Sequence, residues 1–451
     1  MPPAFRRRFA GKAGIAAIGA IAVVALAVSF GCASAGGGAA AEARTSALAD
    51  APEVTARQIM VTLPPGSPGQ WSQVADELQM RFRLKPVFAW SFASISERCL
   101  VFEVTGGRPP AEVATRVATD PRVKSAEPIQ LFTALGGRGR AGQDAPVPAA
   151  PPAPPAAAGR SSYSRLQYAP RTLHLEEAHR WATGKGVRVA VVDTGVDLTH
   201  PDLRSRVVKA SNFVDRGEQT FTSDIHGTAV AGVIAAAAAS ESGISGAAPE
   251  AEIFALKACW PQTPGARQAV CNSYTLAKAI DFAIVERAQV LNFSLAGPQD
   301  PILDRLIRAA IKRGIVVVAA QSPDRQAGRS FPASVEGVIA VLDTDVEGGL
   351  RSPPPPPHPP LVAAPGVDIL TTAPHGSYDF FSGSSLAAGE VSGVVALLLE
   401  KNPKLSPAQL KALLEKTAHP VKGAPGDADP AVGLIDACAA LGQLVPGAAC
   451  P

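Results

Sequence analysis

The sequence lacks a pronounced excess of either charge. Its 42 lysine and arginine residues are nearly balanced by 39 aspartate and glutamate residues, leaving a formal net charge of +3 over 451 residues. Proteins whose main partner is nucleic acid or another strongly acidic surface usually carry a clustered and much larger basic excess. The composition therefore argues against nucleic-acid binding, and we expect no electrostatic steering of a charged partner.

Aromatic residues are also scarce, at 5% of the chain, and alanine-rich runs supply apolar surface in their place. The sequence is nevertheless 47% apolar and 18% charged, which predicts a globular body rather than wholesale disorder. Beyond the N-terminus, every apolar segment of membrane-spanning length has the pattern of a core helix. At roughly 100 to 200 residues per domain, the length predicts two or three domains.

The N-terminus carries the features of an export signal over residues 1–35. Three arginines at 6–8 and Lys12 precede an apolar stretch at 15–28, which is short for a membrane span. Three outcomes stay open: cleavage after small residues near Ala33 to Ala35, lipidation of Cys32, or an uncleaved anchor. We expect an exported protein that is secreted, periplasmic or a tethered lipoprotein, with the membrane contacted only through the signal or a lipid on Cys32.

Cysteines number only six, and export permits them to form disulfides. Cys259 and Cys271 are twelve positions apart, as are Cys438 and Cys450, which predicts two local bridges. Cys99 is then left free. The alternative is that all are buried thiols.

Proline is the residue in excess. The chain has 42 prolines among 451 residues, or about 9%, whereas about 5% is usual. A cluster at 146–155 indicates an extended linker, assigned to residues 133–162. A second cluster at 353–360 must form a surface excursion, because a run of prolines cannot occupy a central strand.

Residues 57–132 show the element order β-α-β-β-α-β, with helical spacing at 71–82 and 111–119 and a last strand across 123–132. This order predicts a small α+β domain of the ferredoxin-like type. A flexible segment at 36–56 precedes it.

Residues 163–444 alternate strands with helices, followed by a tail at 445–451. This alternation predicts an α/β fold with a doubly wound, mostly parallel sheet covered on both faces. The expected strands are 187–192, 253–258, 290–295, 315–320 and 338–342, and the expected helices include 230–239, 274–287, 302–312 and 385–400.

Three polar residues stand where such a sheet places a site, at strand ends and helix starts. Asp193 ends a buried strand, His226 lies at the lip of an alanine-rich helix, and Ser385 begins a helix after a glycine-flanked turn. A serine hydroxyl needs a base to take its proton, usually a histidine held by a buried carboxylate. A helix N-terminus adds N–H groups that stabilise an oxyanion.

The chain order Asp, His, Ser differs from the Ser, acid, His order of α/β-hydrolases. Three segments resemble the signature blocks of the subtilisin-like serine proteases: Asp193-Thr194-Gly195, His226-Gly227-Thr228 and Gly383-Ser384-Ser385-Leu386-Ala387. The resemblance implies that Asp193 orients, that His226 acts as base and acid, and that Ser385 is the nucleophile.

Several alternatives to these assignments remain at this stage. Asp197 is an alternative acid, and Ser384 is an alternative nucleophile. We interpret the other histidines as surface or structural groups, and no cluster has the spacing of metal ligands. These histidines are His174, His179, His200, His358, His375 and His419.

The resemblance has further implications. Ser294-Leu295-Ala296-Gly297 looks like the family strand that pairs with the main chain of a polypeptide substrate. Residues 57–132 resemble the family's propeptide, a folding aid and inhibitor. The sequence leaves open whether the linker at 133–162 is cut; a new N-terminus near residue 160 that depends on Ser385 would establish self-processing. No cofactor is implied; family members often carry structural calcium, but no ligands for it can be assigned here.

Two departures from the family pattern bear on activity. The family's oxyanion-hole asparagine is absent, and Gln321 and Ser322 are the candidates to replace it. Loss of such a donor lowers turnover about 100- to 1,000-fold. The family's Pro-His after the nucleophile is Gly389-Glu390. Two main hypotheses follow: an exported serine endopeptidase of reduced activity, or a catalytically weak protease-like binding or scaffold protein. An esterase or amidase is a third.

Overall fold

The computed structural model describes most of the chain outside its first 55 residues. The predicted signal at 1–35, Cys32, nearly all of 36–56, most of the linker and the proline cluster at 353–360 lie outside the described residues. The described ranges are 56–136, 163–214, 223–239, 243–263, 266–322, 330–352, 361–422, 431–448 and residue 450.

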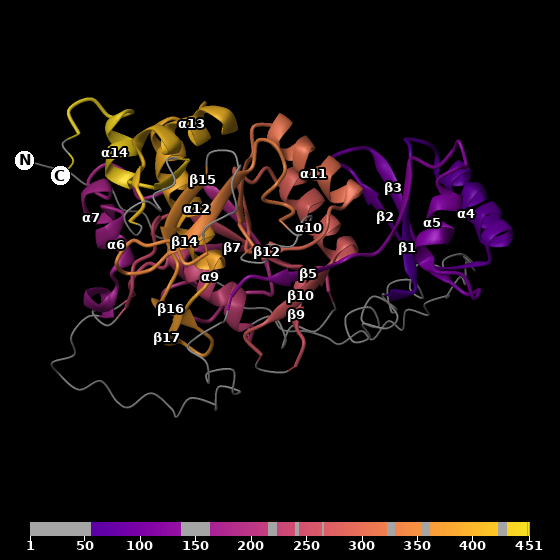
Figure 1. The fold of residues 1–451 in the computed structure, drawn as a ribbon, viewed down its shortest axis with the longest axis horizontal. Coiled ribbons are helices and arrows are strands. Elements are labelled where there is room, and N and C mark those ends of the chain that lie inside the picture. The colour runs from indigo at the N-terminus through magenta and orange to yellow at the C-terminus, as the bar shows by residue number, and fades with distance from the viewer. Residues whose placement is uncertain are drawn as a thin grey trace, which may run out of the picture.

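The first domain, which we call the N-terminal domain, is a four-stranded antiparallel sheet with two helices on one face (Figure 1). Its strand order, β2-β3-β1-β4, is that of the ferredoxin-like fold. Apolar side chains of both helices pack on one face of the sheet. Its elements are β1 (Gln58–Leu63), α4 (Pro68–Phe82), β2 (Leu84–Phe92), β3 (Glu97–Val104), α5 (Pro110–Val117) and β4 (Ser125–Pro128).

The second domain, the C-terminal domain, is built on a nine-stranded sheet of order β18-β19-β15-β14-β13-β11-β6-β8-β7. All neighbouring strands are parallel except β18 and β19. The strands are β6 (Arg188–Asp193), β7 (Val207–Asn212), β8 (Glu252–Lys257), β11 (Val290–Phe293), β13 (Val316–Ala320), β14 (Ile339–Thr344), β15 (Leu361–Pro365), β18 (His419–Pro420) and β19 (Val432–Leu434).

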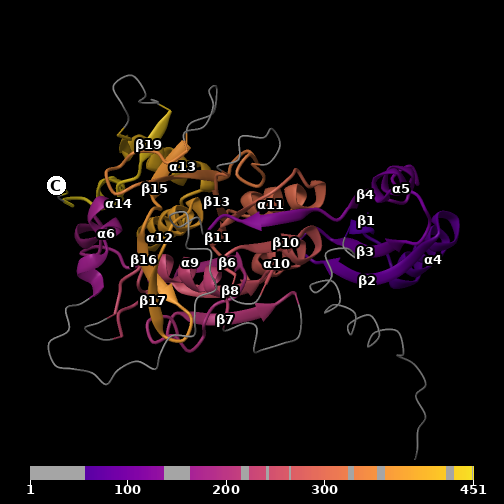
Figure 2. The same ribbon diagram turned by 60° about the horizontal axis from the view of Figure 1, so that its bottom comes forward.

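Both faces of this sheet are buried, because its central strands are apolar on both sides. Val189 and Val191 of β6 face one core, whereas Ala190 and Val192 face the other. Helices α9 (Ile225–Ala235) and α12 (Ser384–Lys401) cover the first face, joined by α6 (Ala169–Thr172), α7 (Leu175–Ala178), α13 (Pro407–Thr417) and α14 (Ala437–Gly442). Helices α10 (Ser273–Val285) and α11 (Pro301–Lys312) cover the second. The doubly wound fold class is confirmed (Figures 1 and 2).

The two domains share a core. Phe88, Phe92 and Val101 on the open face of the N-terminal sheet belong to the same apolar cluster as side chains of α10 and α11. Polar contacts surround this cluster: Asp281 of α10 accepts the Ser94 N–H at 2.8 Å, and Arg305 of α11 donates to Glu97 at 3.1 Å.

The predicted strand across 123–132 is in fact two strands that belong to different domains. After Pro128 the chain leaves the N-terminal sheet, and β5 (Leu131–Ala134) lies between β10 (Ala269–Asn272) and β12 (Leu295–Ala296) of the C-terminal domain. Figure 1 shows β5 running alongside β10. Residues 133 and 134, interpreted as linker, are therefore part of a sheet, because two strand edges offer them main-chain hydrogen bonds.

Both predicted disulfides are present. Cys259 and Cys271 join β9 (Cys259–Pro261) to β10, and Cys438 is joined to Cys450. Cys99 is buried and free, as expected. In the described part of the chain, no helix combines the length and apolar character needed to cross a bilayer.

Candidate active site

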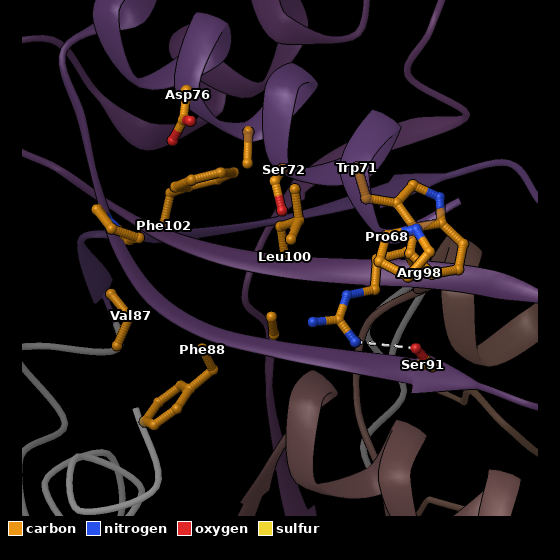
Figure 3. A pocket seen from close by; sticks show the side chains of 13 residues that line it. Pro68, Trp71, Ser72, Asp76, Val87, Phe88, Ser91, Arg98, Leu100 and Phe102 are labelled. Atoms are coloured by element: carbon orange, nitrogen blue, oxygen red, sulfur yellow. Dashed lines mark hydrogen bonds between the residues drawn. The ribbon is translucent and has the colours of Figure 1, made fainter. Parts of the chain in front are cut away.

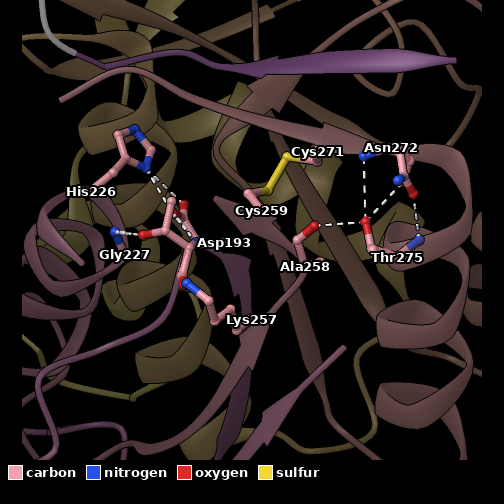
Figure 4. The surroundings of a disulfide bond; sticks show 10 residues. Asp193, His226, Gly227, Lys257, Ala258, Cys259, Cys271, Asn272 and Thr275 are labelled. Carbon is pink, nitrogen blue, oxygen red and sulfur yellow. Dashed lines mark hydrogen bonds and ion pairs between the residues drawn. A yellow bond between two sulfur atoms is a disulfide. The ribbon is translucent and has the colours of Figure 1, made fainter. Parts of the chain in front are cut away.

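Asp193, His226 and Ser385 converge at the carboxyl edge of the parallel sheet. Asp193 is the last residue of β6, His226 lies in the first turn of α9, and Ser385 in the first turn of α12. The His226 Nδ1 lies 2.8 Å and 3.0 Å from the two carboxylate oxygens of Asp193 (Figure 4). All three residues are buried, at 2%, 6% and 0% exposure.

The alternative acid, Asp197, has other partners. Its carboxylate accepts the N–H groups of Thr199 and His375, both at 2.9 Å. The alternative nucleophile, Ser384, donates its hydroxyl to the Gln321 carbonyl at 2.9 Å. The geometry therefore favours Asp193 and Ser385 in the roles that the motif blocks give them.

Lys257, which the sequence analysis missed, lies beside the Asp193 and His226 pair (Figure 4). Its buried Nζ donates to the Thr194 carbonyl at 2.6 Å and pairs with Asp224, the residue that precedes α9. These contacts join the loop after Asp193 to the start of the helix that carries His226. The available signal was a lysine directly after the apolar run 253–256 of strand β8.

A second buried network supports Ser385. The Ser294 hydroxyl donates to the Ser385 carbonyl at 3.1 Å and accepts from the Asn292 amide at 2.9 Å. The Asn292 oxygen in turn accepts from the Ser392 hydroxyl of α12 at 2.9 Å. Helix α12 is thus fixed to the strand β11 by side chains that are all hydrogen-bonded.

The chain after β5 enters this site from the N-terminal domain. Leu295 pairs with Ala134, and the Leu135 N–H donates to the Ser294 carbonyl at 2.9 Å. The Leu135 carbonyl accepts the backbone N–H of Ser385 at 3.3 Å, at the positive end of α12. The predicted segment 294–296 therefore pairs with an extended peptide that belongs to the same chain.

Gly136 lies close to His226 Nε2 and Ser385 Oγ. A Cβ on this residue would stand 2.5 Å from His226 Nε2 and 3.2 Å from Ser385 Oγ. Among the described residues, neither of these buried atoms has a hydrogen-bond partner. Gly383 also allows this segment to come close, since a Cβ on Gly383 would lie 2.3 Å from the Leu135 oxygen. The peptide bond between Leu135 and Gly136 thus lies beside His226 and Ser385.

Side chains of β5 alternate between the molecule and solvent. Phe132 and Ala134 are buried, whereas Leu131 and Thr133 are exposed. The Phe132 ring packs on Gly297, where a Cβ would come within 2.3 Å of the ring, and its centroid is 6.2 Å from that of Phe331. Gly297 itself pairs with Phe331 rather than with β5. Because Gly297 has no side chain, it leaves space for the Phe132 ring beside β5.

Comparisons with known proteins agree with this geometry. A sequence model described as the subtilase family matches residues 184–434. Thermitase from Thermoactinomyces vulgaris is 34% identical over 262 residues, which are 58% of this chain and 91% of thermitase. The chain belongs to the subtilase family. The predicted resemblance to subtilisin-like serine proteases is confirmed, and the chain is a serine peptidase by family.

The chain matches just under two thirds of the length of two further relatives. The thermophilic serine proteinase of Bacillus sp. strain AK1 is 35% identical over 263 residues, or 58% of this chain and 64% of that protein. The solved structure of fervidolysin from Fervidobacterium pennivorans, described as a keratinolytic enzyme related to subtilisin, has a TM-score of 0.66 and 26% identity. It covers 86% of this chain, which spans 61% of fervidolysin.

The candidates for the missing oxyanion donor occupy the turn after β13 (Val316–Ala320). The Gln321 amide Nε2 donates to the Ser330 hydroxyl at 3.1 Å rather than to the Leu135 oxygen. Ser322 ends the described part of this loop. The Leu135 carbonyl accepts the Ser385 N–H at 3.3 Å.

The other departure from the family pattern is buried inside the nucleophile helix. Glu390 is 4% exposed, and its Oε2 has no hydrogen-bond partner among the described residues. Burial raises the pKa of this carboxyl to about 8. Gly389, its neighbour, packs against Val233 of α9, where a Cβ would come within 2.4 Å. The glycine therefore allows close approach of α12 to α9.

A separate cavity of about 570 Å³ lies in the N-terminal domain, between α4 and β2 (Figure 3). Trp71, Arg98 and Phe102 are among its lining residues, and Arg98 donates to Ser91 at 2.9 Å. Asp193, His226 and Ser385 are not among its lining residues.

Proposed function

We propose that the chain is a serine endopeptidase that cleaves peptide bonds through an acyl-enzyme on Ser385. The observation that carries the proposal is the extended peptide at 131–136, whose Leu135 to Gly136 bond lies against His226 and Ser385. Membership of the subtilase family supports the same reaction class.

In the proposed reaction, His226 Nε2 takes the proton of the Ser385 hydroxyl as Oγ attacks the carbonyl carbon. Asp193 holds the ring by its contact with Nδ1 and stabilises the imidazolium that forms. The Ser385 N–H donates to the oxyanion. His226 then protonates the departing amine, and water releases the acyl group by the same route.

Because the asparagine is absent, we expect a lower turnover than in relatives that keep it. With Gln321 bonded to Ser330, its amide does not replace the family's asparagine, and loss of one such donor costs about 100- to 1,000-fold in turnover. The triad contributes more than this, so slow turnover rather than inactivity is expected.

The first substrate in this proposal is the chain itself. Strand β5 fills the substrate groove, the gap between β10 and β12, and pairs with both of these strands. The N-terminal domain therefore blocks the groove before the bond after Leu135 is cut. After the cut, β5 still blocks the groove until the N-terminal domain dissociates. This cut falls at the start of the predicted linker rather than near residue 160. The N-terminal domain then acts as the inhibitor that the resemblance implied.

The groove also predicts which substrates are accepted. Two side chains upstream of the proposed cleavage site are buried: Phe132, three residues before Leu135, and Ala134, directly before Leu135. We expect substrates with an aromatic residue and a small residue at these two positions. Thr133 is exposed, so its position should tolerate most side chains.

Localisation follows from the N-terminal sequence in this proposal. The charged and apolar pattern of residues 1–35 supports export, either by cleavage after Ala35 or by lipidation of Cys32. The two disulfides fit an oxidising compartment outside the cytoplasm.

The proposal is tested by peptide hydrolysis and active-site labelling. Wild type should cleave a peptide containing Phe-Thr-Ala-Leu-Gly after leucine and react with a fluorophosphonate probe. Ser385→Ala should do neither, whereas Ser334→Ala, an exposed serine-to-alanine control, should retain both. If wild type neither labels nor hydrolyses while still binding the peptide, the protein is instead a protease-like binding protein.

A further inference from the structure

A cluster of two histidines and one aspartate lies among elements away from the triad. The His174 Nδ1 and the His419 Nε2 each lie 2.8 Å from the same oxygen, Oδ2 of Asp436. All three atoms lie within 4.8 Å of one another. His174 stands between α6 and α7, His419 in β18, and Asp436 immediately before α14. We propose that His174, His419 and Asp436 bind a divalent transition-metal ion, with zinc as the natural occupant.

The donor set matches this class of ion. Two imidazole nitrogens and one carboxylate oxygen are ligands that zinc takes with a water in the fourth position. Each nitrogen that now faces Asp436 carries a lone pair when its proton is on the other ring nitrogen or lost to solvent. The two ring nitrogens can therefore serve as ligands beside the same carboxylate oxygen.

The distances require only a small rearrangement. Zinc bonds to nitrogen and oxygen of about 2.0 to 2.2 Å place tetrahedral ligand atoms roughly 3.3 Å apart. The two nitrogens, each 2.8 Å from the Asp436 oxygen, must therefore move away from it by about half an ångström. His419 can make this adjustment, because its side chain is 59% exposed.

The backbone around the cluster is already fixed. The Leu173 carbonyl accepts the Ala437 N–H at 3.0 Å, and His419 pairs with Leu434 between β18 and β19. Asp436 is 4% exposed at its side chain, and its second oxygen, Oδ1, accepts the Ala439 N–H at 2.8 Å. The carboxylate is thus held in place and has Oδ2 directed at the two rings.

The proposed ion is structural. It would join the start of the C-terminal domain to its end, since His174 and Asp436 are 262 positions apart in the sequence. Figure 1 shows α14 beside α7. The Cys438 to Cys450 bridge begins two residues after Asp436, so metal and disulfide would secure the same segment.

The test uses the full chain carrying Ser385→Ala, which keeps it intact, after metal removal and dialysis. Titration with cobalt(II) should produce the visible absorption bands of a tetrahedral site at one equivalent, and zinc should abolish them by displacement. Zinc at 100 times its dissociation constant should raise the folded-to-unfolded ratio about 100-fold, which is read as a higher melting temperature.

Matched variants decide whether the cobalt bands and the zinc-dependent stabilisation come from this cluster. His419→Ala removes a largely exposed ring, and His174→Asn keeps a residue that tolerates the left-handed backbone at φ 52°. Both should lose the cobalt bands and the zinc-dependent stabilisation. His375→Asn, the same change at an exposed histidine with φ 65°, should retain both. Absence of tetrahedral bands in the parent, or equal bands in all variants, would overturn the proposal.

Discussion

Glu390 gives the most quantitative prediction, because its pKa shift has a single cause. The carboxyl is buried in α12, and burial raises its pKa from 4.5 to about 8. The folded protein therefore holds this proton more tightly than the unfolded chain does. The resulting stability is full below pH 4.5 and is lost as the pH rises to about 8.

The size of the effect follows from the width of this window. At about 1.4 kcal/mol per pKa unit, the shift amounts to ~5 kcal/mol across the window. Glu390→Gln should remove this part of the pH dependence, since an amide does not titrate there. Glu390→Met should in addition raise stability at every pH by about 1 to 3 kcal/mol, because Oε2 has no hydrogen-bond partner to lose.

The assay is urea unfolding of the Ser385→Ala protein at pH 5 and pH 8.5, followed by fluorescence. The parent should lose several kcal/mol more than Glu390→Gln between the two pH values. Glu336→Gln is the matched control, because Glu336 is 93% exposed and should leave the parent's slope unchanged. An identical pH dependence in the parent and in Glu390→Gln would refute the reasoning.

Three further predictions concern the groove and the domain interface. Burial, and then Asp300, raise the pKa of Glu127 to about 8, so the cleaved N-terminal domain should dissociate more readily as the pH rises from 4.5 toward 8. Gel filtration at pH 5.5 and 8.5 measures this, and Glu127→Gln should reduce the difference. Replacing both Cys259 and Cys271 by serine should lower the unfolding free energy by about 2 to 3 kcal/mol and raise KM for peptides more than it lowers kcat, because the bridge supports β10. Asp193→Asn should lower kcat about 10⁴-fold in the peptide assay, since the histidine tautomer is no longer fixed.

Features that depend on local sequence were predictable. Asp193, His226 and Ser385 each stand in a short motif at a strand end or helix start. The cysteine pairs are each twelve residues apart. The alternation of apolar strands and amphipathic helices was enough to predict a doubly wound sheet.

Features that depend on long-range contacts were not. The strand across 123–132 was expected to be continuous, because nothing local shows that residues after Pro128 pair with β10 and β12 of another domain. Gln321 was a reasonable oxyanion candidate until its amide was seen to bond Ser330. His174, His419 and Asp436 carry no motif; the packing of α14 near α7 and the pairing of β18 with β19 bring them together.

Lys257 is an intermediate case. A lysine at the end of an apolar strand indicates a buried partner, since an unpaired buried ammonium is costly. The identity of that partner, Asp224, depends on how α9 approaches β8. Sequence could therefore have indicated that Lys257 is paired, although it could not have named the pair.

The most direct test of the central claim is the N-terminal sequence of the C-terminal fragment after purification. Wild type should be cut between Leu135 and Gly136, so that Gly136 is the new N-terminus, and Ser385→Ala should remain intact at this bond. The Ser334→Ala control should be cut like wild type. An uncut wild-type chain, or the same cut in Ser385→Ala, would contradict the account.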